Sequence, residues 1–214
     1  MSRYAYVNGR YLPFRDAKVH VEDRGYQFAD AVYEVCEVRA GRLVDERRHL
    51  DRLERSLAAI RLRPPMGRAA LGVVLREVVA RNRIRFGLVY LQIGRGVARR
   101  DLAFPLPQPS PSIVVTARPL NRARIDASAA TGIAVVSAPD NRWGRVDIKT
   151  VGLLPNALAR QAAIEQGARE AFITSATQTV MPVVRIDGRA VGDGKPGPLA
   201  TTLRKEFHRF AEID

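Results

Sequence analysis

The sequence has only one cysteine, Cys36, among its 214 residues, and this excludes a disulfide within the chain. Cys36 lies in the short segment 35–38 between valines, so we expect a small core side chain and not a nucleophile. The three histidines are scattered, with no cysteine cluster near them, and no metal-ligand spacing is present. These absences argue against a disulfide-stapled domain and against a metal centre.

Long hydrophobic runs are also missing. No stretch approaches the length of a membrane span, and residues 1–4 carry no apolar core of a secretory signal. Hydrophobic residues make up 46% and charged residues 27% of the chain, as in an ordinary globular protein. We therefore expect a cytoplasmic protein with no membrane partner.

Lysine is scarce as well: the chain has four, and arginine supplies the rest of its 35 basic residues. The formal net charge of +13 favours small anionic ligands such as phosphates and carboxylates. The basic residues are spread along the whole chain and aromatic residues do not interleave with them, unlike a nucleic-acid interface. We expect no nucleic-acid partner.

Helical periodicity is clearest in two segments. Apolar residues at helical spacing predict helices over about 45–60 and 68–82. The Asn8-Gly9 and Asp187-Gly188 pairs predict hairpin turns, because both positions of such a pair tolerate positive φ. Between strands expected near 88–93 and 112–116, a loop rich in proline, glycine and arginine is long enough to be functional.

The order of expected elements sets the fold class. Strands and helices mix without strict alternation, so we expect an α+β protein. The pattern restarts after a plausible connecting segment. We expect an N-terminal α+β domain over residues 1–118, an interdomain linker over 119–125 and a C-terminal domain over 126–214.

Among the lysines, Lys149 stands in the most distinctive surroundings. A catalytic lysine must lose its proton near neutral pH, and for that it needs burial or cationic neighbours. Lys149 precedes the apolar residues 151–154, whereas the other three lysines stand among charged residues or in a Gly-Pro loop. Taken alone, a lysine is most often a solvated surface residue, so the assignment depends on the motifs around it.

Five short motifs, in this order along the chain, supply that context. Together they resemble fold-type IV pyridoxal-phosphate aminotransferases of the D-amino-acid transaminase kind. The motifs are DRGYQFADAVYE at 23–34, HLDRL at 49–53, RGVARRD at 95–101, DIKT followed by LLPN at 147–156, and TSAT followed by MPV at 174–183.

The resemblance implies a cofactor site for pyridoxal 5′-phosphate. It implies that Lys149 forms a Schiff base with the cofactor and moves the proton at the substrate's Cα. Arg52 matches the arginine that grips the phosphate, and Ser175, Ala176 and Thr177 match the loop on the phosphate side. Without the resemblance, Arg52 would be a solvated helix arginine and the three loop residues a polar loop.

The resemblance also implies the substrates and the assembly. Tyr33 matches the tyrosine that lines the pocket, although a core aromatic on a strand would have the same sequence signal. Arg100 matches the arginine that binds the substrate carboxylate. The implied protein is a homodimer of two-domain α+β subunits, with its site between the domains. It would exchange an amino group between a D-amino acid, or another small amino acid, and a 2-oxo acid.

Two departures from the family pattern bear on function. D-amino-acid transaminases have a histidine two positions after the substrate arginine, and here that position is Leu102. The family also has a segment between the lysine helix and the TSAT loop, with a glutamate for the pyridine nitrogen and a phosphate cup. The sequence passes directly through 167–170 instead, so we expect a shortened C-terminal domain.

Two other functions remain open at this stage. One is a fold-type IV lyase of the aminodeoxychorismate kind, which would use the same lysine. The other is a family remnant with impaired catalysis, which the missing segment favours.

Overall fold

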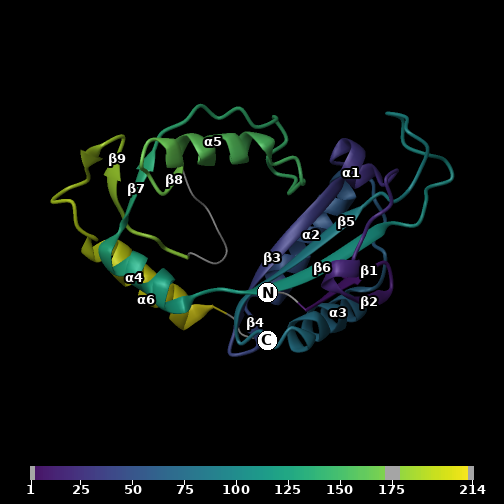
Figure 1. Cartoon of the computed structure of the whole chain (residues 1–214), viewed down its shortest axis with the longest axis horizontal. Coiled ribbons are helices and arrows are strands. Elements are labelled where there is room, and N and C mark those ends of the chain that lie inside the picture. Colours follow the sequence, from purple (N-terminus) through teal and green to yellow (C-terminus); the bar gives the residue numbers. More distant parts are fainter. Residues whose placement is uncertain (1–2, 172–178, 212–214) are drawn as a thin grey trace. The chain divides into compact units, whose positions relative to one another are not determined.

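The structure, a computed structural model, describes residues 3–171 and 179–211. The chain forms two compact units (Figure 1). Unit 1 contains the described residues up to Leu120 together with Arg145–Gly152. Unit 2 contains Asn121–Gly144 and the described residues of Leu153–Ala211. Helix and sheet occur in both units, which confirms the α+β fold class.

Unit 1 is built on a six-stranded antiparallel sheet with the strand order β2-β1-β6-β5-β3-β4. Helix α2 packs on β3, and helix α3 packs on β1, β5 and β6 (Figure 1). The elements are β1 (Tyr4–Val7), β2 (Arg10–Pro13), α1 (Arg24–Phe28), β3 (Ala31–Arg39), β4 (Arg42–Leu43), α2 (Glu46–Ala59), α3 (Arg68–Arg81), β5 (Phe86–Gly94) and β6 (Ser112–Pro119), with a 3-10 turn at Phe14–Asp16.

The core of unit 1 lies between the sheet and its two helices. On α2, Leu50, Leu53 and Leu57 are 2–3% exposed, as their spacing predicts. Cys36 is 2% exposed and belongs to the same core, so it is a packing residue. The expected helices over 45–60 and 68–82 are both confirmed to within about two residues at each end.

The two expected hairpin turns are also present. Asn8 and Gly9 have φ angles of 46° and 94°, and this positive pair joins β1 to β2. Asp187 and Gly188, with φ angles of 47° and 76°, join β9 (Val183–Ile186) to β10 (Arg189–Ala190) in the same way. Such turns match the twist of the flanking strands.

Unit 2 has a four-stranded sheet in the order β10-β9-β7-β8, in which the central β7 runs parallel to both β8 and β9. Its remaining elements are α4 (Arg122–Thr131), β7 (Ile133–Val136), α5 (Leu154–Glu165), β8 (Glu170–Ala171) and α6 (Pro198–Phe210). Helix α4 begins at Arg122, so the second half of the segment expected as a linker over 119–125 is helical. The side chain of Asn121 caps that helix by accepting from Arg124 N at 3.0 Å.

Residues 145–152 belong to unit 1, whereas the expected domain division placed them in the C-terminal domain. An isolated antiparallel bridge pairs Thr150 with Val32 of β3. Ile148 is 5% exposed and lies in the core of unit 1. The sequence did not indicate this, because the segment has no periodicity. The division into domains over 1–118 and 126–214 otherwise stays a proposal.

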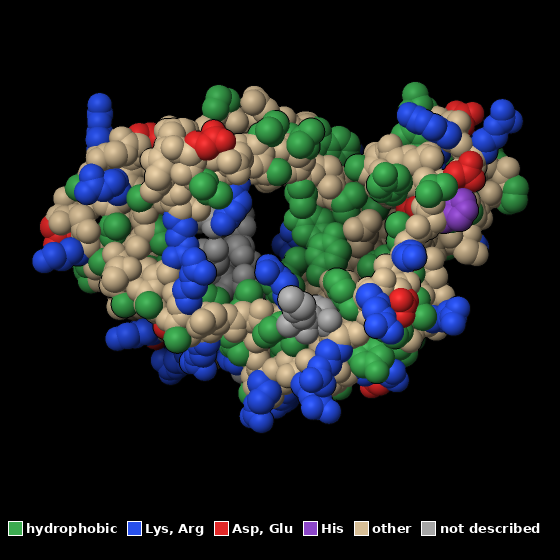
Figure 2. Space-filling view, viewed as in Figure 1, with side chains coloured by type: hydrophobic (Ala, Val, Ile, Leu, Met, Phe, Trp, Pro, Cys, Tyr) green, Lys and Arg blue, Asp and Glu red, His purple; other side chains and the backbone are tan. Residues whose placement is uncertain are grey.

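Unit 2 has a thin core. On α5 only Ala163 is buried, and α6 has no buried residue. Leu154, Leu158 and Ile164 of α5 are 70%, 62% and 50% exposed. Figure 2 shows hydrophobic side chains at the surface along this helix, with basic side chains spread over the visible face. Within the described residues, no helix is both long and apolar enough to cross a membrane.

Candidate active site

Lys149 lies against the beginning of strand β3. Tyr33 N donates to the Lys149 carbonyl at 3.0 Å, and Lys149 N donates to Oγ of Ser56 on α2 at 3.3 Å. Ser56 is 2% exposed, so the hydroxyl that receives this bond is itself fixed in the core. The backbone of Lys149 is therefore held from two sides, by a strand and by a helix of unit 1.

The side chain of Lys149 contacts an aromatic pair. Its Nζ lies 4.2 Å from the centroid of the Tyr33 ring, and that ring stacks on Tyr90 of β5 at a centroid distance of 5.6 Å. Tyr90 donates from its hydroxyl to Oε1 of Gln92 at 2.9 Å. Burial raises the pKa of Tyr90 to about 12, with a smaller contribution from Tyr33, so its hydroxyl remains protonated at neutral pH. In the described part of the chain, the Lys149 amine makes no ion pair with a carboxylate.

A buried carboxylate stands next to Tyr33 in the sequence of β3. Glu34 is 1% exposed, and its two oxygens accept from Nε and Nη2 of Arg52, both at 2.6 Å. Nδ1 of His49 lies 2.9 Å from the same carboxylate. Burial alone would raise the pKa of Glu34, but the hydrogen bonds from Arg52 and His49 outweigh it and hold the pKa below its ordinary value.

Glu34 fixes only one edge of the Arg52 guanidinium. Nη1 of Arg52 has no hydrogen-bond partner among the described residues, and the side chain is 41% exposed. A guanidinium fixed on one edge and open on the other is suited to an oxyanion such as a phosphate.

Arg100 lies on the loop between β5 and β6, and it is exposed. Its guanidinium carbon is 4.9 Å from the centroid of the Phe28 ring. Ser175, Ala176 and Thr177, the expected phosphate-side residues, lie outside the described residues.

Of the expected site residues, Lys149 and Tyr33 are in direct contact. Arg52 is on the same helix as Ser56, which holds the Lys149 backbone. Sequence reasoning missed Ser56, Tyr90 and the role of Glu34. The signal for Glu34 was a charged residue within an apolar strand, and the signal for Ser56 was a small polar residue beside the apolar stripe of α2.

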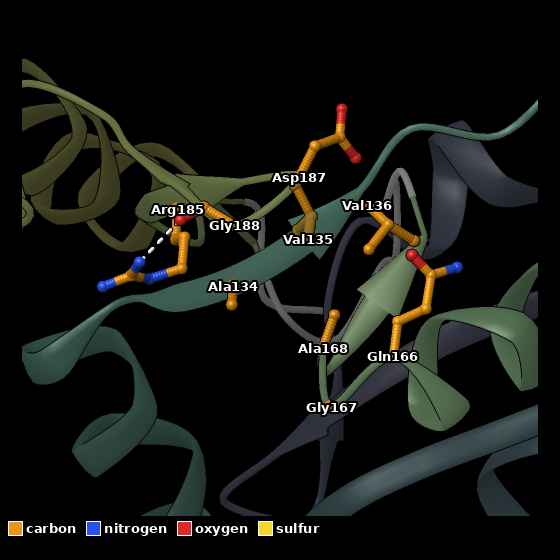
Figure 3. Close-up of a pocket in the computed structure, with 9 residues that line it drawn as sticks. All are labelled: Ala134, Val135, Val136, Gln166, Gly167, Ala168, Arg185, Asp187 and Gly188. Atoms are coloured by element: carbon orange, nitrogen blue, oxygen red, sulfur yellow. Dashed lines mark hydrogen bonds between the residues drawn. The ribbon is translucent and has the colours of Figure 1, made fainter.

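Unit 2 has a hollow of its own, with a volume of about 360 Å³ (Figure 3). Residues 134–136 of β7 line it together with residues 166–168, which connect α5 to β8. Arg185 also lines it and donates to the Gly188 carbonyl at 2.7 Å. This connection is where the sequence leads us to expect a missing segment.

Comparison with known families gives one match over most of the chain. Residues 31–185 match the family model described as amino-transferase class IV. A D-alanine aminotransferase of Listeria monocytogenes serotype 1/2a is 39% identical over 271 aligned positions, covering 94% of this chain and 93% of its own. One from Staphylococcus haemolyticus is 29% identical over 276 positions, covering 97% of both chains.

These alignments have more positions than this chain has residues, although they cover nearly all of both partners. The relatives therefore carry residues that have no counterpart here, as expected for a shortened chain.

Solved structures agree on the fold. The branched-chain amino acid aminotransferase from Escherichia coli has a TM-score of 0.79 at 17% identity, covering 98% of this chain and 94% of its own. A hypothetical aminotransferase from Mycobacterium tuberculosis, solved in its PLP-bound form, has a TM-score of 0.74 at 16% identity, covering 94% of this chain and 96% of its own.

Proposed function

We propose, since this chain belongs to the class IV aminotransferases, that it transfers an amino group between a D-amino acid, or another small amino acid, and a 2-oxo acid. The family is one of pyridoxal-phosphate enzymes with amino acid and 2-oxo acid substrates. The contact of the Lys149 amine with the Tyr33 ring supports specific residues for this proposal, and the Glu34–Arg52 pair involves the next residue of the same strand.

The described residues of unit 1 fit this cofactor. Lys149 presents an amine without an ion-pair partner, which suits an aldehyde, and Arg52 presents a free guanidinium edge, which suits a phosphate. When bound, pyridoxal phosphate supplies an electron sink for the amino acid's Cα. Ser175, Ala176 and Thr177 stay proposed phosphate contacts.

We assign the chain's own residues the following roles. The Lys149 amine would move the proton from the substrate's Cα to C4′ of the cofactor in one half-reaction, and would move a proton in the opposite direction in the other. Tyr33 contacts the amine with its ring face and lines the pocket. The Ser56 hydroxyl oxygen positions Lys149 by accepting from the Lys149 backbone N–H, and the Glu34 carboxylate orients Arg52. Arg100 binds the substrate carboxylate through its guanidinium.

Two measurements test the function together. We expect purified protein mixed with pyridoxal phosphate and freed of excess cofactor to keep a visible absorption band. Lys149→Ala should lose the band, whereas Lys18→Ala, which removes another lysine of the same unit, should keep it. We then expect D-alanine to donate its amino group to 2-oxoglutarate faster than L-alanine or L-leucine does.

A second candidate is supported by the alignments, in which the relatives carry residues absent here. If the missing segment carries the acid and phosphate donors that the family resemblance implies, this chain is a member with impaired catalysis. A folded protein without the absorption band would favour this candidate. Release of pyruvate and 4-aminobenzoate without an amino acceptor would instead favour the lyase.

The assembly and location are proposed on the family resemblance. We propose a homodimer in the cytoplasm. Light scattering behind a sizing column, over a range of concentrations, tests the dimer, and a mass equal to one chain at every concentration would contradict it.

A further inference from the structure

Two buried arginines share one carboxylate at the entrance of strand β3. Nε of Arg24 lies 2.8 Å from Oδ2 of Asp30, and Nε of Arg95 lies 2.7 Å from the same oxygen. Nη2 of Arg95 also donates to Oδ1 of Asp30 at 2.9 Å. The side chains of Arg24 and Arg95 are 3% and 2% exposed. Two buried positive charges therefore stand against one negative charge.

The remaining donors of Arg95 bind backbone carbonyls and so serve the fold of unit 1. They reach the Ile60 carbonyl at 2.8 Å and the Arg61 carbonyl at 3.3 Å, just beyond the last turn of α2. The carbonyl end of a helix carries partial negative charge, which stabilises a buried cation there. The ring of Phe104 covers the guanidinium at 3.7 Å.

The remaining donors of Arg24 bind the loop that carries Arg100. Its two terminal nitrogens donate to the carbonyls of Asp101 and Leu102, the second at 3.4 Å. Its backbone N–H donates to the Gly96 carbonyl at 3.0 Å, near the start of the same loop. Arg24 therefore holds the loop on both sides of Arg100.

A shared aromatic ring adds a second connection. The guanidinium carbons of Arg24 and Arg100 lie 4.8 Å and 4.9 Å from the centroid of the same ring, that of Phe28 on α1. The ring therefore touches both the residue that holds the loop and the residue that the loop presents.

We propose that Arg24 is a positioning residue, which fixes the carbonyls of Asp101 and Leu102 and so sets where Arg100 meets the substrate carboxylate. The proposal rests on the proposed function, in which Arg100 binds that carboxylate. Asp30 does not need Arg24, because Arg95 already gives it two hydrogen bonds. The donors of Arg24 that point away from Asp30 go to the two residues directly after Arg100.

The hydrogen bonds from Arg24 to the carbonyls of Asp101 and Leu102, which we call the clamp, also bear on the choice of side chain at position 102. The side chain of Leu102 is 81% exposed, and the loop is held by its carbonyl instead. The hydrogen bond at position 102 therefore does not require a particular side chain there.

The variant Arg24→Lys tests the clamp, because an ammonium can keep the pair with Asp30 but has no fork to reach two further carbonyls. We expect the KM for amino acid and 2-oxo acid to rise about tenfold, with kcat and the cofactor absorption band unchanged. Hydrogen exchange of the backbone amides in residues 97–108 should become faster. In an Arg100→Ala background, Arg24→Lys should raise KM no further, since the two act on one contact.

Arg76→Lys is the control for replacing an arginine that pairs with a buried carboxylate, although the Arg76 side chain is 51% exposed and that of Arg24 only 3%. Arg76 donates to Glu46, whose side chain is as buried as that of Asp30, at 10% exposed, and both residues lie on the helices of unit 1. We expect no change in KM and no change in loop exchange. A rise in KM for this variant as large as for Arg24→Lys would overturn the proposal, because it would reflect general loosening.

The readouts separate this proposal from the proposed function. If the wild-type protein turns nothing over, calorimetric titration with pyruvate still measures carboxylate binding. Weaker pyruvate binding and faster loop exchange in Arg24→Lys would then support the clamp although the transaminase fails. If the wild type is active and Arg24→Lys changes neither loop exchange nor KM, or adds its effect to that of Arg100→Ala, the clamp is wrong.

Discussion

Glu34 is the residue on which the site's electrostatics depend. It is a buried carboxylate that two basic side chains keep ionised, and it belongs to the core as much as to the site. Removing the negative charge leaves Arg52 without its fixed partner, and His49 as well. The same change therefore acts on stability and on the orientation of the guanidinium.

We predict that Glu34→Gln lowers the free energy of unfolding by about 2 kcal/mol at neutral pH, the size of hydrogen bonds to charged groups. The pKa of Glu34 is lower in the folded protein than its ordinary value. Its contribution is therefore present above that ordinary value and is lost as the pH falls through the folded value. The gap between variant and wild type should narrow as the pH falls below about 4.

Urea unfolding followed by circular dichroism at several pH values measures this gap. Glu54→Gln is the control, because Glu54 is 51% exposed and pairs with Arg68 only at 3.5 Å. Its effect should stay under about 0.5 kcal/mol throughout. A gap for Glu34→Gln that does not change with pH would show that the charge of Glu34 is not what stabilises the fold.

At the residue level, the resemblance of five motifs to a known family implied Lys149, Tyr33, Arg52 and Arg100 as site residues. It could not indicate the partners that orient them. Ser56 and Glu34 act through the tertiary fold, and each comes close to its partner only when α2 packs on β3. A single sequence gives the residue types, but it does not show which side chains come close to one another in the fold.

Among the elements, helices α2 and α5 show how differently the two units are packed. Both have leucines at helical spacing, but Leu53 of α2 is 2% exposed and Leu158 of α5 is 62% exposed. The same substitution in the two helices therefore compares a packed face with an open one.

We predict that Leu53→Ala lowers the free energy of unfolding by about 3 kcal/mol, because it removes buried methyl groups and leaves a cavity. Leu158→Ala should change it by less than about 0.5 kcal/mol, because the side chain already meets solvent. Urea unfolding measures both. A loss of comparable size for Leu158→Ala would mean that the α5 face is covered in solution.

Element positions were predictable where local chemistry is strong. The stripe of α2 and the Asn8-Gly9 turn each specify their structure within a few residues. Helix α4 was missed because its residues, RARIDASAAT, are mostly small or charged and form no apolar stripe. The path of residues 145–152 onto β3 was also unpredictable, because a single added strand-like contact leaves no periodicity in the sequence.

For the whole molecule, the two units should differ in stability. Unit 1 has a continuous core that includes Val32, Leu53 and Ile148. In unit 2, helix α5 packs on the two-residue strand β8 and buries only Ala163, while α6 buries none of its side chains. Regions with few buried apolar contacts open at low free-energy cost, whereas core strands exchange only in global unfolding.

We predict that backbone amides of α5 exchange hydrogen at least about a hundredfold faster than those of β3 and β5. Lys149 belongs to unit 1, so the nearby amide of Val151, which donates to the Ala31 carbonyl of β3 at 3.2 Å, should be protected although α5 begins only a few residues later. The boundary between slow and fast exchange should thus fall between 152 and 154. Mass spectrometry of peptides on either side of this boundary locates it. Equal protection of α5 and β3 would mean that the exposed leucines are covered, and a dependence of that protection on protein concentration would identify a second copy as the cover.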